Sequence, residues 1–142
     1  MKRQQPEFRL QCVIADYLRA QHPFLLWFAV PNGEKRSAIT GARLKRMGVR
    51  AGVADILIFY GERFMAIELK AGKGTLQDTQ TDFRNAWLSS GGLYAVCRSL
   101  EELQACLNEW GIPKIQKCPP GNAFGSITPN VVKPSKRGKI AE

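Results

Sequence analysis

The chain has 142 residues, enough for one domain of roughly 100–150 residues, and 44% of them are hydrophobic, so it can bury a core. Lysine and arginine outnumber aspartate and glutamate by 21 to 12, and the net charge of +9 favours an anionic partner such as nucleic acid. No run of 18 apolar residues occurs, so we expect no membrane-spanning helix. A single histidine argues against a histidine-rich zinc site. Four cysteines without a CxxC pair fit a reducing cytoplasm.

The first half of the chain predicts a helix, a strand and a short helix. Residues 4–21 carry apolar side chains at helical spacing, and Pro6 suits the opening turn of a helix. The run "FLLWFAV", residues 24–30, predicts a buried strand that ends at the turn signal "PNG". Residues 37–47 predict a short helix that Gly48 ends.

A hairpin and two further helices are predicted in the second half. Residues 53–60 and 63–72 read as two strands around the turn Gly61-Glu62. Residues 75–88 predict an amphipathic helix, in which Thr75 and Asp78 can form a variant capping box. Residues 93–98 predict a strand. Residues 99–111 predict a helix that Ser99 and Glu102 cap.

This order of elements predicts an α/β fold with a mixed sheet and helices on both faces. We expect residues 1–112 to form the folded domain. Residues 113–142 hold five of the eight prolines and six basic residues against one acid, with little periodicity. We therefore predict that they form an extended basic tail.

Two carboxylates occupy the apolar hairpin. If Gly61-Glu62 is a two-residue turn, counting back along the strands places Asp55 directly opposite Glu68, with Cβ atoms about 4.5–5.5 Å apart. Lys70 then shares a face with Glu68. At an effective dielectric constant near 20 the two facing charges repel by about 3–4 kcal/mol.

A divalent cation that takes one oxygen from each acid would relieve this repulsion, and oxygen-only ligands fit Mg²⁺ or Mn²⁺ better than zinc. A shared proton would also relieve it. So would splaying of the acids into water, at a solvent-facing edge where Lys70 pairs with Asp55 or Glu68.

Two more polar side chains lie on helix faces that should point inward. Glu7 is three residues before Leu10 on the apolar face of the first helix, and Gln80 lies between Leu76 and Phe83 at helical spacing. Glu7 can instead be an acid stabilised by the helix dipole, and Gln80 a buried amide bonded to backbone groups. Four inward polar groups from three elements favour a shared site.

A basic segment precedes the hairpin. It contains six basic residues and no acid: Lys35, Arg36, Arg43, Lys45, Arg46 and Arg50. Such a segment can bind DNA phosphates without reading sequence, or it can be a solvated helix face.

Four stretches resemble the virus-type replication-repair nuclease domain, VRR-NUC, of the PD-(D/E)xK nuclease superfamily, which includes the nuclease module of the Fanconi-associated nuclease. They are "VPNGEKRS", "GARLKRMGVRAGVADILIF", "MAIELKAGKGTLQDTQ" and "GGLYAVCRSLEEL". The resemblance covers about residues 7–110. It implies a restriction-endonuclease-like mixed sheet flanked by helices.

The resemblance implies five catalytic residues: Glu7, Asp55, Glu68, Lys70 and Gln80. Asp55 and Glu68 would ligate Mg²⁺ or Mn²⁺ together with the backbone carbonyl of Leu69, while Glu7 would contact the metal directly or through water. Lys70 matches the lysine of the ExK motif, which orients or activates the attacking water. The basic segment would contact DNA.

Two positions depart from the family's pattern. Ala54 stands where a proline usually precedes the aspartate, and Gln77 stands where a serine is expected at the start of the next helix. We expect altered local backbone there and no lost ligand.

The function these features imply is a metal-dependent, structure-selective DNA endonuclease of DNA repair or recombination. Stand-alone family members resemble dimeric enzymes that cut branched DNA such as Holliday junctions, so we expect a cytoplasmic homodimer, of bacterial or phage origin. The apolar side chains of Trp27, Trp87 or Trp110 can serve a dimer interface or the core. Alternatives are a non-catalytic DNA-binding module and a nuclease for single-stranded DNA or RNA.

Overall fold

The computed structural model describes residues 6–31 and 37–115. The eight elements in chain order are α1 (Pro6–Gln21), β1 (Leu26–Ala29), α2 (Ala38–Arg46), β2 (Ile56–Tyr60), β3 (Arg63–Leu69), α3 (Asp78–Ser89), β4 (Leu93–Cys97) and α4 (Leu100–Glu109). Each lies in a segment for which the sequence predicts that type of element. Within the described ranges, no helix is long and apolar enough to cross a membrane.

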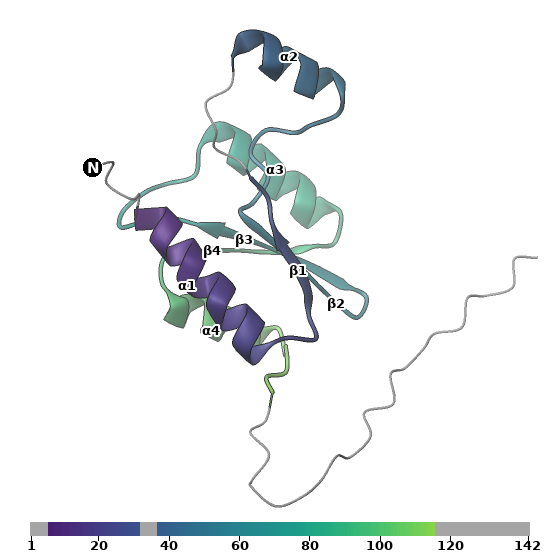
Figure 1. The fold of residues 1–142 in the computed structure, drawn as a ribbon. Helices are drawn as coiled ribbons and strands as arrows, with labels where there is room; N and C mark the ends of the chain where they lie inside the picture. Colours follow the sequence, from purple (N-terminus) through teal and green to yellow (C-terminus); the bar gives the residue numbers. More distant parts are fainter. Residues whose placement is uncertain (1–5, 32–36, 116–142) are drawn as a thin grey trace, which may run out of the picture.

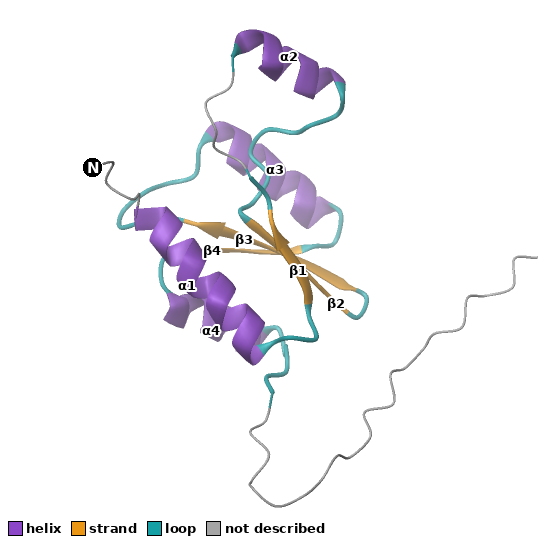
Figure 2. Ribbon diagram, viewed as in Figure 1, coloured by secondary structure: helices purple, strands orange, loops and turns teal. Residues whose placement is uncertain are grey.

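The four strands form one mixed sheet in the order β1-β2-β3-β4 (Figures 1 and 2). The first three run antiparallel, and β4 runs parallel to β3 after the chain crosses over through α3. Tyr60 pairs with Arg63, as the two-residue turn requires, and Gly61 has φ +61°. Continued by one residue beyond Ile56↔Ile67, this register places Asp55 opposite Glu68.

Helices cover both faces of the sheet, as predicted. Helices α1 and α4 pack on one face, where Ile14, Leu18, Ile67 and Leu103 belong to the larger core. Helix α3 packs on the other face, where a smaller core comprises Ala54, Ala66 and Phe83. Because successive strand residues point to opposite faces, β3 is buried on both sides, and its even-numbered residues face α3.

The prediction that the first strand is buried is wrong. The run 24–30 is predicted as a buried strand, but β1 is an edge strand of four residues, with Leu26 63% and Phe28 45% exposed. The reason is that α3 packs on β4 at the other edge of the sheet and leaves the same face of β1 open. Trp27 points to the opposite face and packs against the larger core.

Helix α2 stands apart from the rest of the described structure. Within the described ranges it contacts no other helix or strand, and none of its residues is buried (Figure 1). Ser37 caps its first turn. Gly48, with φ +93°, follows its end, as the sequence predicts.

The prediction of which residues cap the start of α3 is also wrong. The helix begins at Asp78, and its N-cap is Gln77, so Thr75 and Asp78 do not form the capping box. The backbone N–H of Gln77 instead donates to Oε1 of Gln80, 2.9 Å away.

The predicted division of the chain at residue 112 stays a prediction, because residues 116–142 of the basic tail lie outside the described ranges.

Candidate active site

A pocket of about 350 Å³ lies where the hairpin strands and the first turns of α1 and α3 meet. It is lined by Glu7, Gly52, Val53, Asp55, Glu68, Lys70, Gln77, Thr79 and Gln80. All five predicted catalytic side chains are in this set. Their roles stay predictions, but the pocket brings together residues from positions 7 to 80.

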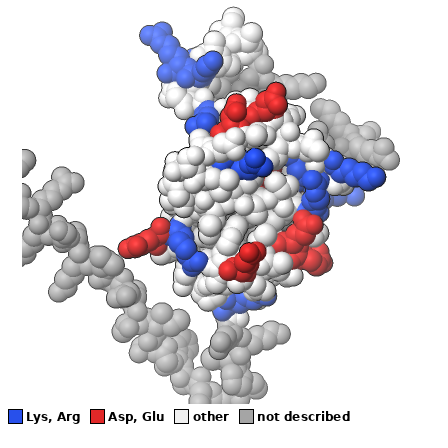
Figure 3. Space-filling model, turned by 180° about the vertical axis from the view of Figure 1, so that it is seen from behind, with Lys and Arg blue, Asp and Glu red and all other residues white. Residues whose placement is uncertain are grey.

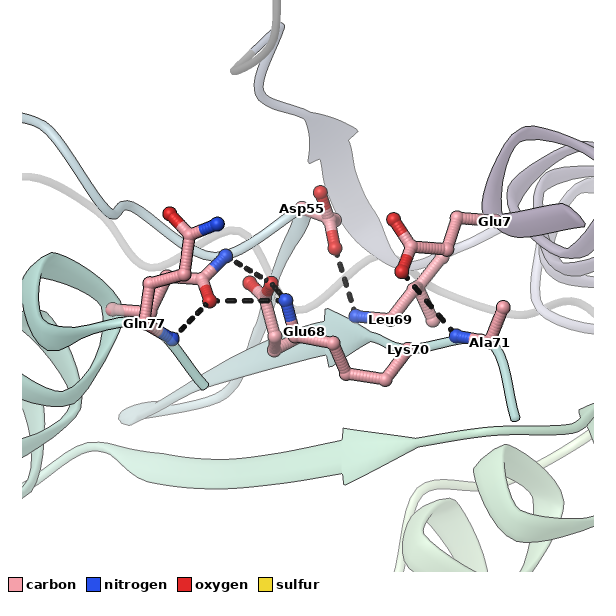
Figure 4. Close-up of polar contacts among 8 residues, drawn as sticks. Glu7, Asp55, Glu68, Leu69, Lys70, Ala71 and Gln77 are labelled. Carbon is pink, nitrogen blue, oxygen red and sulfur yellow. Dashed lines mark hydrogen bonds and ion pairs between the residues drawn. The ribbon is translucent and has the colours of Figure 1, made fainter. Parts of the chain in front are cut away.

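The two acids of the hairpin meet across β2 and β3 (Figure 4). Asp55 lies one residue before β2, and its Oδ2 accepts a hydrogen bond from Leu69 N at 2.8 Å. Glu68 is 2% exposed and faces α3 from β3. Its Oε2 is buried without a hydrogen-bond partner among the described residues. This oxygen is therefore an unsatisfied acceptor that a donor or a cation could satisfy.

The other oxygen of Glu68 belongs to a closed polar network. Gln80 donates from Nε2 to Glu68 Oε1 at 2.6 Å, and the Lys70 ammonium lies 3.2 Å from the same oxygen. Lys70 also donates to Gln80 Oε1 at 3.0 Å. This amide oxygen accepts from Gln77 N as well, so the first turn of α3 holds Gln80 in contact with both the acid and the ammonium.

Glu7 reaches the pocket from the first turn of α1. Its Oε1 accepts a hydrogen bond from the backbone N–H of Ala71 at 3.3 Å, and the residue is otherwise exposed (Figure 4). Glu7 is thus an exposed residue that lines the pocket, and the prediction that it lies on a buried, inward face of α1 is wrong. No three His, Cys, Asp or Glu side chains in the described ranges are close enough to form a metal cluster.

Burial changes the acid chemistry of the pocket. It raises the pKa of Asp55, against the lowering effect of the Leu69 N–H. Burial, followed by the nearby charge of Asp55, raises the pKa of Glu68 to about 7. Both carboxyl groups thus lose part of their preference for the charged form, mainly because they are buried.

The predicted DNA-binding residues lie outside the pocket. Arg43, Lys45 and Arg46 are on α2, and Arg50 follows it, with its guanidinium 5.9 Å from the centre of the Phe83 ring. Figure 3 shows Lys and Arg side chains at the top of the molecule, where α2 lies, and others spread over the body. Lys35 and Arg36 fall outside the described residues.

Sequence reasoning missed part of the pocket wall. Gly52 packs so closely against α3 that a Cβ there would lie 2.1 Å from the carbonyl oxygen of Thr79. No local pattern in the sequence marks this contact. The spacing of Gln77 and Gln80 does fit the N-cap and N3 positions of a capping box, so this pair could have been predicted from the sequence. Ala54, at the position of the missing proline, is fully buried in the smaller core.

No protein-family model matches the chain, and no curated protein matches it. Among solved structures, the chain is similar to one described as a VRR_NUC domain protein, with 18% sequence identity and a TM-score of 0.59. The matched region covers 76% of this chain and 89% of that chain.

The mixed four-stranded sheet with helices on both faces defines an α/β fold of the restriction-endonuclease-like class. More particularly, the likeness to the solved domain shows that the chain has a VRR-NUC-like fold, which confirms the fold that the sequence motifs imply.

Proposed function

We propose that this protein is a metal-dependent endonuclease that hydrolyses phosphodiester bonds in branched DNA such as Holliday junctions. One observation carries the proposal: Asp55, Glu68 and Lys70 converge in one pocket, where Glu68 Oε2 is buried without a partner in the described part of the chain. A purely structural site would be expected to satisfy that oxygen.

The donor set fits Mg²⁺ or Mn²⁺ and not zinc. Asp55 and Glu68 offer carboxylate oxygens to the pocket. The backbone carbonyl of Leu69, a residue that is not among those lining the pocket, and water would supply further hard oxygen ligands. Glu7, which lines the pocket, would contact such an ion directly or through water. When bound, the ion would act as a Lewis acid toward the phosphate and lower the pKa of a bound water.

The chain's own groups would orient the nucleophile. An ammonium has three N–H donors, and Lys70 directs two of them at Glu68 and Gln80. The third can donate to the attacking water or to an oxygen of the scissile phosphate, which gains charge during the reaction. Gln80 fixes the ammonium in place because its amide bridges Lys70, Glu68 and the N-terminus of α3.

Substrate binding would use the basic side chains of α2. Arg43, Lys45 and Arg46 follow one another along its last turns without a neighbouring acid. Phosphate contacts of this kind position DNA without reading its sequence, which suits selection by structure. A two-fold dimer would present two pockets to the two cut strands of a junction. We place this homodimer in the cytoplasm of a bacterium or a phage-infected cell.

Of the two roles open to the three tryptophans, a dimer interface or the core, their packing supports the core. Trp27, Trp87 and Trp110 are each partly buried and pack against the cores. Among the more exposed apolar side chains are Leu26 on β1, which is 63% exposed, and Ile39 on α2, which is 84% exposed.

Two alternatives use the same fold. A non-catalytic DNA-binding module would need the basic residues of α2 but not a buried Glu68–Lys70 pair, which is costly to keep unless it has a role. A nuclease for single-stranded DNA or RNA would need the same pocket, and only the substrate would differ.

The test is cleavage of labelled four-way junction, flap, duplex and single-stranded DNA, and of RNA, with Mg²⁺ or EDTA. We expect Mg²⁺-dependent cutting that favours the junction, and a loss of about 10²–10⁴-fold in Asp55→Asn and Lys70→Met. Arg63→Met, at the opposite end of β3 from Lys70, is the control and should cut normally.

Other results of this experiment would support one of the alternative functions or exclude the pocket as the active site. Binding without metal-dependent cutting would favour the non-catalytic module. Cutting of single strands or RNA in preference to junctions would replace the substrate class. Full activity of Asp55→Asn would show that the pocket is not the catalytic centre.

A further inference from the structure

The segment that begins at Lys70 makes two hydrogen bonds to residues at the end of β4 and just after it. Lys70 N donates to the carbonyl of Cys97 at 3.1 Å, which extends the parallel pairing past the end of β3. Two residues later, the carbonyl of Gly72 accepts a hydrogen bond from Arg98 Nη1 at 2.7 Å. The backbone N–H of Ala71, which donates to Glu7, lies between these two contacts.

Arg98 is itself fixed by the first turn of α4. Its backbone N–H donates to Glu102 Oε2 at 2.6 Å, while Glu102 N donates to the capping hydroxyl of Ser99 at 3.2 Å. Helix α4, although it packs on the far face of the sheet from Glu68, therefore sets the position from which the Arg98 side chain reaches Gly72.

The segment that Arg98 holds also curls back onto Lys70. Gly72 has φ +54°, and Gly74 N donates to the carbonyl of Ala71 at 3.1 Å, which closes a tight turn. A Cβ added to Gly74 would lie 3.6 Å from Cδ of Lys70, so this turn runs beside the lysine's aliphatic stem. Movement of Gly72 would thus disturb the neighbours of both Glu7 and Lys70.

We propose that Arg98 is a positioning residue of the pocket: its hydrogen bond to Gly72 fixes the turn of residues 71–74, and through it the placement of Glu7 and Lys70. The expected effect of Arg98 on the cleavage rate rests on the proposed nuclease function. Its expected effect on the conformation of the turn is independent of that function. Arg98 would act through the backbone of this turn and would not need to touch DNA.

The experiment compares Arg98→Met, which removes the donor, with Arg98→Lys, which keeps a cationic donor. Arg63→Met is a matched control, because Arg63 also donates from Nη1 to a backbone carbonyl, that of Trp110, at the opposite end of β3. All three are tested for single-turnover junction cleavage in Mg²⁺, for junction affinity in Ca²⁺, and for amide hydrogen exchange.

We expect Arg98→Met to lower the single-turnover rate about ten- to a hundredfold, because small misplacements of catalytic groups cost rates of this order. Its junction affinity should stay within about twofold, and amide exchange should accelerate in residues 70–74 but not in 93–97. Arg98→Lys should recover most of the rate, and Arg63→Met should match wild type in all three measurements.

Unchanged rate and exchange in Arg98→Met would overturn the proposal. So would a loss confined to affinity, with a shallower salt dependence, because Arg98 would then be a phosphate contact. If wild type shows no metal-dependent cleavage, the nuclease function fails, and exchange at residues 70–74 still decides the role of Arg98. If Arg98→Met does not fold, exchange in Arg98→Lys decides: intermediate protection of the turn supports the proposal, and wild-type protection overturns it.

Discussion

A carboxyl group that is almost fully buried and faces a second carboxyl group is unfavourable as an anion unless its charge is offset. Glu68 has such an offset at one oxygen only, from the Lys70 ammonium and the Gln80 amide. Its other oxygen has no partner among the described residues, and its pKa is raised to about 7. Without a cation, this residue should therefore make the folded protein sensitive to pH.

The sign of this sensitivity follows from the two pKa values. Between its ordinary pKa of 4.5 and the folded value of about 7, Glu68 binds a proton in the folded state that it has lost in the unfolded state. The free energy of unfolding should thus fall as pH rises through this window, by at most about 3 kcal/mol from Glu68. Asp55, whose pKa is also raised, acts in the same direction.

Urea unfolding in EDTA from pH 4.5 to 8, for wild type and Glu68→Gln, measures this effect. The stability of the variant relative to wild type should increase with pH and level off above about pH 7. Glu62→Gln, in the exposed hairpin turn, is the control and should run parallel to wild type. A constant difference between wild type and Glu68→Gln would contradict the raised pKa.

Among the elements, α3 depends on a backbone contact with the loop after α2. Gly52 has φ +77° and packs against the first turn of α3, so close to Thr79 that no side chain fits. That turn carries Gln80, which bridges Glu68 and Lys70. The fit between Gly52 and Thr79 therefore helps to set the geometry of the pocket.

We expect Gly52→Ala to be far more damaging than Gly48→Ala. Both glycines have positive φ, so alanine costs about 1–2 kcal/mol at either position. At Gly48 a Cβ would meet no heavy atom within 4 Å, whereas at Gly52 it would collide with backbone, which should add roughly 1–3 kcal/mol or more. Urea unfolding measures both losses, and equal losses would show that the loop moves aside freely.

The same elements show what the sequence could predict. Periodicity and turn residues predict each helix and strand, because these signals are local, and the turn Gly61-Glu62 predicts the register that brings Asp55 to Glu68. Contacts such as that of Gly52 with Thr79 are long-range and have no local pattern. The exposure of β1 was also missed, because an apolar run does not reveal which strand becomes the edge of the sheet.

Across the whole molecule, the sheet with α1, α3 and α4 forms the packed body, and α2 projects from it (Figure 1). The sequence predicts the basic character of α2 but not its separation from the body, since both a packed and a projecting helix can be amphipathic. Ile39, Arg43 and Arg46 lie at helical spacing on one side of α2, and Ile39 is 84% exposed. This side therefore faces solvent.

If α2 binds DNA phosphates, the double variant Arg43→Gln/Arg46→Gln should weaken junction binding and reduce the slope of log K against log salt by about two, since each phosphate contact contributes about 0.9. The control Arg19→Gln/Lys114→Gln removes the same charge near the C-terminal end of α1 and should change the slope little, because Arg19 pairs with Asp16 and Lys114 lies over Tyr17. Fluorescence anisotropy in Ca²⁺ at several salt concentrations measures both slopes. Equal reductions in the two variants would mean that net charge, and not the location of α2, governs binding, whereas an unchanged slope in the first variant would remove α2 from the DNA-binding surface.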